Sequence, residues 1–169
     1  QKPLWELPLE DIDRVIDVNM KGMVYGSYIA LHGMLKQGKG TIYNMEGYGS
    51  SGMKTAGKTT YGSTKYALRY FTQSLQKEVK DTPVIVGTMS PGIVTTDMLQ
   101  DAYRDRPEAW ERAKKMFNIL ADTVETVTPS LVEQTLSTTS KTPKVEWLTT
   151  PKIFWRFLTA PITKRQVYT

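Results

Sequence analysis

Residues 40–65 read GTIYNMEGYGSSGMKTAGKTTYGSTK, and this stretch combines three kinds of local signal. GTIYNM at 40–45 is a short run rich in β-branched and apolar residues, which predicts a buried strand. Glycine and serine are frequent in 46–57 and predict a loop. From 58 to about 80, apolar side chains recur along one helical face, so the order strand, loop and helix is predicted.

The same alternation continues on both sides of this stretch. Residues 8–37 read as one long helix, which Gly38 ends in the manner of a left-handed cap residue. VIVGTM at 84–89 predicts a second strand, and SPGIVTTDM at 90–98 predicts a second loop. Alternating helices and strands build a parallel sheet with helices on both faces, so the predicted fold class is α/β. Ligands of such sheets bind beyond the carboxyl ends of the strands, where both loops lie.

The remainder of the chain is predicted to be more helical. Helices are expected at 107–121 and 125–138, a short strand at 144–148, and an aromatic and basic tail from about 145 to 169. No internal repeat is present, and 169 residues are enough for one domain with a core of its own.

The composition excludes several classes of site. The chain has no cysteine and a single histidine, so we expect no disulfide framework, thiolate nucleophile, bound metal or Ser-His-Asp hydrolase. The net charge of +5 is modest and the cations are mixed with acids, so no nucleic-acid partner is expected. No apolar run reaches the ~20 residues that a membrane-spanning helix needs.

Two phosphate-binding patterns occur in the loop without the surroundings that they need. Residues 52–59 match G-x-x-x-x-G-K-[ST], but EGYGSS separates this match from the strand, and no later strand ends in a magnesium-binding aspartate. GYGSSG at 47–52 matches G-x-G-x-x-G, but the helix begins too late for a tight strand-to-helix turn. A nucleotide-triphosphate site built on Lys58 and Thr59 is therefore kept only as a minor alternative.

The Y-x-x-x-K pattern formed by Tyr61 and Lys65 fits its surroundings. Side chains four residues apart on a helix share one face. A tyrosine hydroxyl with its ordinary pKa of ~10 is a weak acid, and a neighbouring ammonium stabilises the phenolate and lowers that pKa. Tyr61 is also expected in the first helical turn, where the helix dipole acts in the same direction. The pair is therefore predicted to transfer a proton where the two loops meet.

Four ordered motifs resemble the second half of the short-chain dehydrogenase/reductase family, over residues 1 to about 100. They are DVNMKG around Asn19, GTIYNM with its glycine loop, YGSTK, and SPGIVTTDM. The resemblance implies a Rossmann-like doubly wound parallel sheet and a nicotinamide-dependent oxidoreductase. It also implies that the N-terminal βαβ half is absent from this chain, so that 1–169 would be the C-terminal part of a single domain.

The resemblance implies a role for each matching residue. Tyr61 would donate a proton to a carbonyl group and contact the cofactor. Lys65 would bind the nicotinamide ribose and lower the pKa of Tyr61, and Asn19 would hold a water of a proton relay. The second loop would supply the remaining contacts to the cofactor, through Pro91, Gly92, Val94 and Thr96.

One position departs from the family pattern. The family's serine lies thirteen residues before the tyrosine, where this chain has Tyr48, and its usual Ser-Ser pair after the strand is Glu46–Gly47. Ser50 is expected to supply the missing hydroxyl, with Ser51 as the alternative. Loss of such a donor costs roughly 3 kcal/mol, which would weaken reduction without abolishing it.

Further details resemble the chlorophyll b reductases and their relatives within this family. These details are an acid–glycine pair after the strand, the run AKKMFNILAD, and the aromatic and basic tail. They imply NADP(H) rather than NAD(H), and an apolar carbonyl substrate such as a formyl group on a tetrapyrrole. They also imply a cytoplasmic or chloroplast stromal protein. The tail is expected either to lie at a membrane surface, such as the thylakoid membrane, or to line a large apolar substrate, and the alternative is that it packs on the domain or in a subunit contact.

The missing half of the fold is expected from preceding polypeptide or from a partner chain, because QKPLWELPLED reads as the middle of a protein. Without that half, the GTIYNM strand would have an unpaired edge. The isolated chain is therefore not expected to be a stable monomer, and the resemblance implies a homo-oligomer. The alternative function is a noncatalytic binding or assembly subunit that keeps the fold.

Overall fold

The computed structural model describes residues 2–168, which form two compact units. The first unit runs through Met89 and includes Thr138–Val145. The second consists of Ser90–Ser137 and the residues from Glu146 onward. Helices and parallel strands alternate along the chain, so the predicted Rossmann-like α/β fold is confirmed.

The long N-terminal helix is confirmed, but it is not uniformly α-helical. A short 3-10 helix, η1 (Leu4–Glu6), precedes α1 (Leu9–Ile16). A π-helical segment, η2 (Asp17–Lys21), then leads directly into α2 (Gly22–Gln37). Gly38 ends the helix with φ of 71°, the left-handed conformation that glycine adopts without steric cost. Apolar periodicity does not reveal the π segment, because the residues around it keep a helical pattern.

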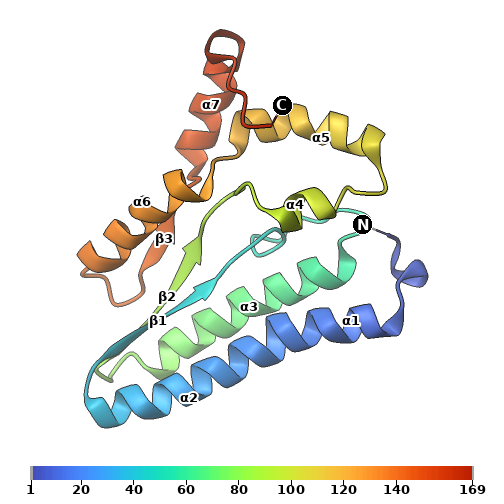
Figure 1. The fold of residues 1–169 in the computed structure, drawn as a ribbon. Helices are drawn as coiled ribbons and strands as arrows, with labels where there is room; N and C mark the ends of the chain where they lie inside the picture. The colour runs from blue at the N-terminus through green and yellow to red at the C-terminus, as the bar shows by residue number, and fades with distance from the viewer. Residues whose placement is uncertain (1, 169) are drawn as a thin grey trace. The chain divides into compact units, whose positions relative to one another are not determined.

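The first unit is built on the predicted strand–loop–helix stretch. Strand β1 (Gly40–Met45) pairs in parallel with β2 (Val84–Ser90), from Gly40 opposite Val84 to Met45 opposite Met89. Strand β3 (Lys144–Glu146) completes the order β1-β2-β3. Helix α3 (Thr59–Glu78) lies beside the α1–α2 helix (Figure 1).

Apolar packing joins α3 to the sheet in the first unit. The core there consists of buried side chains from α3, from its C-terminal end and from β2. Partly buried side chains of α2, β1 and α3 pack against this core. Its members are Leu75, Val79 and Val86, with Leu31, Ile42 and Phe71 packed around them.

The second unit is helical. It contains α4 (Asp97–Asp101), α5 (Pro107–Leu120), α6 (Val124–Ser137) and α7 (Thr150–Thr163). Its core joins α5 to the end of the chain through Phe117, Ala121 and Tyr168.

The predicted C-terminal tail is helical over most of its length. Thr149 precedes α7 and accepts a hydrogen bond from the Lys152 N–H with its side chain, at 3.4 Å. Pro151 lies in the first turn, where a missing N–H costs nothing. Pro161 lies inside the helix, and that residue is the sequence signal against a helix here. Among residues 2–168, no helix combines the length and apolarity needed to cross a bilayer.

Candidate active site

The candidate site lies where β1 ends and α3 begins, within the first unit. Glu46 follows β1, and residues 47–50, which we call the Gly47 turn, come next. Tyr61 lies in the first turn of α3 and Lys65 lies one turn further along. The helical spacing predicted for the pair is therefore present.

Tyr61 and Lys65 lie close together and are both half-buried. The Lys65 Nζ lies 5.9 Å from the centroid of the Tyr61 ring and donates a hydrogen bond to the Met45 carbonyl oxygen at 3.1 Å. Within residues 2–168, the Tyr61 hydroxyl has no hydrogen-bond acceptor, and the Lys65 ammonium has that one acceptor only. The pair therefore retains donors for a ligand.

The electrostatics of the pair correct one expectation. Burial raises the pKa of the Tyr61 hydroxyl above its ordinary value, and burial lowers the pKa of Lys65. The expectation that Lys65 lowers the pKa of Tyr61 is therefore wrong in this structure, because desolvation of the phenolate is the dominant effect. At neutral pH the hydroxyl is protonated, which is the state that a proton donor needs.

Asn19 is connected to Tyr61 through Thr64. The Asn19 side-chain amide donates to the Thr64 hydroxyl at 3.0 Å, and that hydroxyl donates to the Tyr61 carbonyl oxygen at 2.8 Å. Asn19 lies in the π-helical segment, and such segments occur frequently at functional sites. Thr64 was not predicted as a site residue, although it lies within the YGSTK motif.

The residue that faces the Tyr61 hydroxyl is Gly47 rather than Tyr48. A Cβ atom at position 47 would lie 2.7 Å from the Tyr61 hydroxyl oxygen. The Tyr48 hydroxyl instead hydrogen-bonds to Thr55, and the Lys58 ammonium lies 4.1 Å from the centroid of the Tyr48 ring. The residue beside the Tyr61 hydroxyl therefore lies fourteen positions before Tyr61 rather than thirteen.

Ser50 and Ser51 have different environments. Ser50 is buried, and its Oγ accepts a hydrogen bond from the Gly47 N–H at 3.1 Å. Ser51 is exposed. Of the two candidates for the missing hydroxyl, Ser50 is thus the one held in the Gly47 turn.

Comparison with known proteins identifies the family. The model of the short chain dehydrogenase family matches residues 1–107. This chain belongs to the short-chain dehydrogenase family.

Plant members of the family are the relatives most relevant to the predicted substrate. The chain is 36% identical over 160 residues to the probable chloroplastic chlorophyll(ide) b reductase NYC1 of Oryza sativa subsp. japonica, a match that covers 94% of this chain and 31% of the relative. It is 36% identical over 135 residues to the chloroplastic chlorophyll(ide) b reductase NOL of Arabidopsis thaliana, covering 78% of this chain and 37% of the relative. The chain thus spans well under half the length of these reductases.

A solved short-chain dehydrogenase structure shows the same fold. The closed form of serine dehydrogenase complexed with NADP+ aligns with a TM-score of 0.70 and 27% identity, covering 89% of this chain and 60% of that one.

The dehydrogenase motif SPGIVTT lies in the second unit. Gly92 has φ of 73°, and a Cβ atom there would lie 2.5 Å from the Leu148 Cβ, so position 92 has no room for a side chain. Val94 forms an isolated parallel bridge with Asp122, and the Thr96 carbonyl accepts from the Leu99 N–H at 3.0 Å. Pro91 directly follows the last residue of β2. The role of these residues in cofactor binding stays a prediction.

Sequence reasoning missed one charged pair beside the site. Arg69 of α3 donates to Glu46 through Nε at 2.7 Å, and through Nη2 to the second carboxylate oxygen. The Glu46 side chain is almost fully buried. The available signal was an acidic residue directly after the predicted strand, where the dehydrogenase pattern has serine; that strand, β1, was predicted to be buried, but only its Asn44 is buried in the structure.

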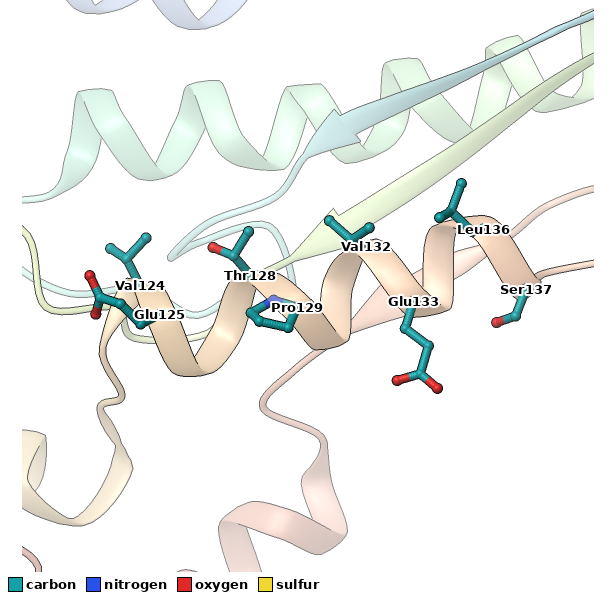
Figure 2. A pocket seen from close by; sticks show the side chains of 8 residues that line it. All are labelled: Val124, Glu125, Thr128, Pro129, Val132, Glu133, Leu136 and Ser137. Atoms are coloured by element: carbon teal, nitrogen blue, oxygen red, sulfur yellow. The ribbon is translucent and has the colours of Figure 1, made fainter.

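A surface hollow on α6 contains none of the predicted site residues. Val124, Val132 and Leu136 form an apolar stripe along it, and only Glu125 and Glu133 of its lining are charged (Figure 2). The lining of this hollow includes neither a phenol nor an ammonium, so the candidate active site remains at Tyr61.

Proposed function

We propose that this dehydrogenase chain supplies the proton-donating half of a nicotinamide-dependent reductase that acts on a carbonyl or formyl group. One observation carries the proposal. The Tyr61 hydroxyl is half-buried, has no acceptor within residues 2–168, and lies beside an ammonium that also has donors to spare. A protonated phenol with no internal acceptor is available to a substrate oxygen.

The proposed reaction balances with one proton from Tyr61. A bound reduced nicotinamide, held in part by Lys65, would supply a hydride to the carbonyl carbon and would itself be oxidised. Tyr61 transfers its proton to the carbonyl oxygen, giving an alcohol, and is then reprotonated from solvent. The contacts from Asn19 to Thr64 and from Thr64 to the Tyr61 carbonyl hold the helix turn from which the proton is delivered. Ser50 is also part of the proposed site, because it lies in the Gly47 turn, which faces the Tyr61 hydroxyl.

The residues present fit a nicotinamide cofactor. The half-buried Lys65 ammonium uses one of its three donors on Met45, which leaves two for ribose hydroxyls. Pro91, Gly92, Val94 and Thr96 are proposed to make the remaining contacts. We propose NADP(H) rather than NAD(H), as the resemblance to the chlorophyll b reductases implies; the NADP+ complex of a related dehydrogenase supports a nicotinamide cofactor.

For the substrate, we propose an apolar formyl compound of the chlorophyll b type, since two relatives are named chlorophyll(ide) b reductases. The outward face of α7 supports an apolar partner, because none of its exposed side chains is charged along the helix. The large apolar side chains among them are Phe154, Trp155, Phe157, Leu158 and Ile162. We propose a chloroplast location, with this face contacting either such a substrate or a membrane surface.

The test uses the full-length protein, NADPH and a chlorophyll b derivative. We expect cofactor oxidation coupled to loss of the formyl group, and we expect Tyr61→Phe to lower kcat by about 10²-fold or more while NADPH affinity stays near that of the wild type. Unchanged turnover in Tyr61→Phe would remove Tyr61 from the chemistry. Tight NADPH binding without oxidation would instead favour the noncatalytic subunit.

A further inference from the structure

The Gly47 turn contacts α3 through backbone atoms at two glycines. A Cβ atom at Gly47 would lie 2.7 Å from the Tyr61 hydroxyl oxygen and 3.2 Å from the Lys65 Cε. A Cβ atom at Gly49 would lie 2.7 Å from the Gly62 Cα. Real Cβ atoms essentially never come within 3.0 Å of another atom, and at Gly49 the neighbour is backbone and φ is 99°, so that position requires glycine. At Gly47 the neighbours are the ends of the Tyr61 and Lys65 side chains, so a Cβ atom there would force the phenol to move. The turn therefore lies flush against the residues that carry the proposed chemistry.

Ser50 forms two hydrogen bonds with Gly47 within this turn. The Ser50 N–H donates to the Gly47 carbonyl at 3.0 Å, and the Gly47 N–H donates to the Ser50 Oγ at 3.1 Å. Ser50 is 2% exposed, so its hydroxyl is held within the protein. Both polar groups of Gly47 are thus fixed by one residue, which leaves the Gly47 Cα little freedom to move relative to the phenol.

We propose that Gly47 sets the position of the Tyr61 hydroxyl, and that Ser50 is a positioning residue which acts on Tyr61 through Gly47. Ser50 then does not replace the missing serine as a donor to the substrate oxygen. The positional part of this inference is that Gly47 and Ser50 fix the place of the Tyr61 hydroxyl, and it does not depend on the proposed function. The catalytic part is that Ser50 affects reduction through Tyr61, and it rests on the proposed function.

The positional part is tested on the phenol itself. The full-length protein is labelled with ¹³C at the tyrosine Cζ, the Tyr61 resonance is assigned with Tyr61→Phe, and its pKa is measured by titration. Gly47→Ala is expected to displace the phenol toward solvent and to lower its pKa, because burial is what raises it. Ser50→Ala is expected to shift the resonance in the same direction by a smaller amount. It should add no further shift when Gly47→Ala is already present.

Two matched variants serve as controls. Ser51→Ala removes an exposed hydroxyl from the adjacent residue, and Gly33→Ala adds a methyl group where nothing lies within 4 Å. Neither is expected to move the Tyr61 resonance. If Gly47→Ala does not fold, Ser50→Ala decides alone. A Tyr61 resonance and pKa equal to the wild type in folded Ser50→Ala would overturn the proposal.

The catalytic part is tested by a double-mutant cycle in single-turnover reduction. If Ser50 acts through Tyr61, Ser50→Ala slows the wild type but has no effect in the Tyr61→Phe background. A direct donor to the substrate oxygen would instead cost about 10²-fold in both backgrounds, and this result would overturn the proposal. A wild-type protein that oxidises no NADPH would defeat the proposed function alone, because the resonance test needs no turnover.

Discussion

At the scale of one residue, Lys65 shows that a partly buried charge in the candidate site lowers the stability of the folded protein. Its ammonium is half-buried with one carbonyl partner, and burial lowers its pKa. The folded state therefore binds this proton less tightly than the unfolded chain does. Stability is lost as the pH falls from the unfolded pKa of Lys, ~10.4, to the lowered folded value, and the loss persists at neutral pH.

Replacing Lys65 should therefore raise the stability of the folded protein and lower the rate of reduction. We expect Lys65→Met to raise the melting temperature at pH 7 by a few degrees, because the cost of the buried charge disappears. Reduction should fall by about 10²-fold, the size of a typical acid–base contribution. Calorimetry and NADPH oxidation measure the two effects. Lys77→Met, at an exposed position of the same helix, should change neither, and a lower melting temperature in Lys65→Met would contradict the argument.

At the scale of elements, the Glu46–Arg69 pair joins the end of β1 to the middle of α3. Removal of one partner of a buried ion pair leaves the other charge poorly compensated. The Glu46 side chain is 4% exposed and that of Arg69 is 26% exposed, so solvent reduces part of the penalty.

We expect Glu46→Ala to lower the free energy of unfolding by about 2 kcal/mol, as measured by urea denaturation. The exposed pair between Arg14 and Asp11 provides the comparison, and Arg14→Ala should cost less than about 1 kcal/mol. Equal losses in the two variants would show that burial of the Glu46 pair contributes nothing.

A second charged cluster, within the second unit, anchors α7. Asp122 is buried and accepts hydrogen bonds from Trp147, Arg156 and Arg165, at 2.5, 2.7 and 2.6 Å. Burial acts to raise the pKa of Asp122. The hydrogen bonds from Trp147 and Arg156 and the charges of both arginines outweigh burial, so the pKa is lowered. Because the pKa of Asp122 is lower in the folded state, its ionised carboxylate stabilises the protein at pH values above the unfolded pKa of ~3.9. This stabilisation is lost as the pH falls through the folded pKa.

The second unit should therefore loosen in acid around this cluster. Below pH ~4 we expect the tryptophan fluorescence to change, because Trp147 loses its charged acceptor. Asp122→Asn should abolish this acid dependence and destabilise α7 at neutral pH. Asp101→Asn, which breaks an exposed pair with Arg104, is the control and should leave the transition in place. An identical acid transition in Asp122→Asn would assign it to other groups.

At the scale of the whole molecule, the first unit exposes groups that normally pair. Within the described residues, β1 lies at the edge of the sheet and hydrogen-bonds to β2 alone. Large apolar side chains on the α1–α2 helix and α3 are also exposed, namely Leu9, Val18, Tyr25, Tyr28, Ile29, Tyr66 and Tyr70. An unpaired edge and exposed apolar helix faces favour association with more polypeptide.

We therefore expect the 169-residue chain to self-associate, with a melting temperature that rises with protein concentration. Sedimentation velocity and melts over a hundredfold concentration range measure this. Ile29→Glu combined with Tyr70→Glu should shift the chain toward smaller species. A cooperative melt that is independent of concentration, with a monomer throughout, would contradict the expectation.

Local patterns were sufficient to predict most of the elements. GTIYNM and VIVGTM became neighbouring parallel strands, and Tyr61 and Lys65 share one helix face, because these features depend on side-chain periodicity. Helix α7 was not predicted, since Pro161 argues against a helix and its stability depends on contacts with distant residues. Arg156 and Arg165 make such contacts with Asp122.

The sequence by itself determined the family, the order of helices and strands, and the pairing of a phenol with an ammonium. Each follows from residue types at short spacings. Only the tertiary structure decided that Gly47 faces the Tyr61 hydroxyl, that Asn19 reaches Tyr61 through Thr64, and that burial raises the pKa of the phenol. Those properties depend on which atoms from distant segments come within a few ångströms of one another, and on how much water they exclude.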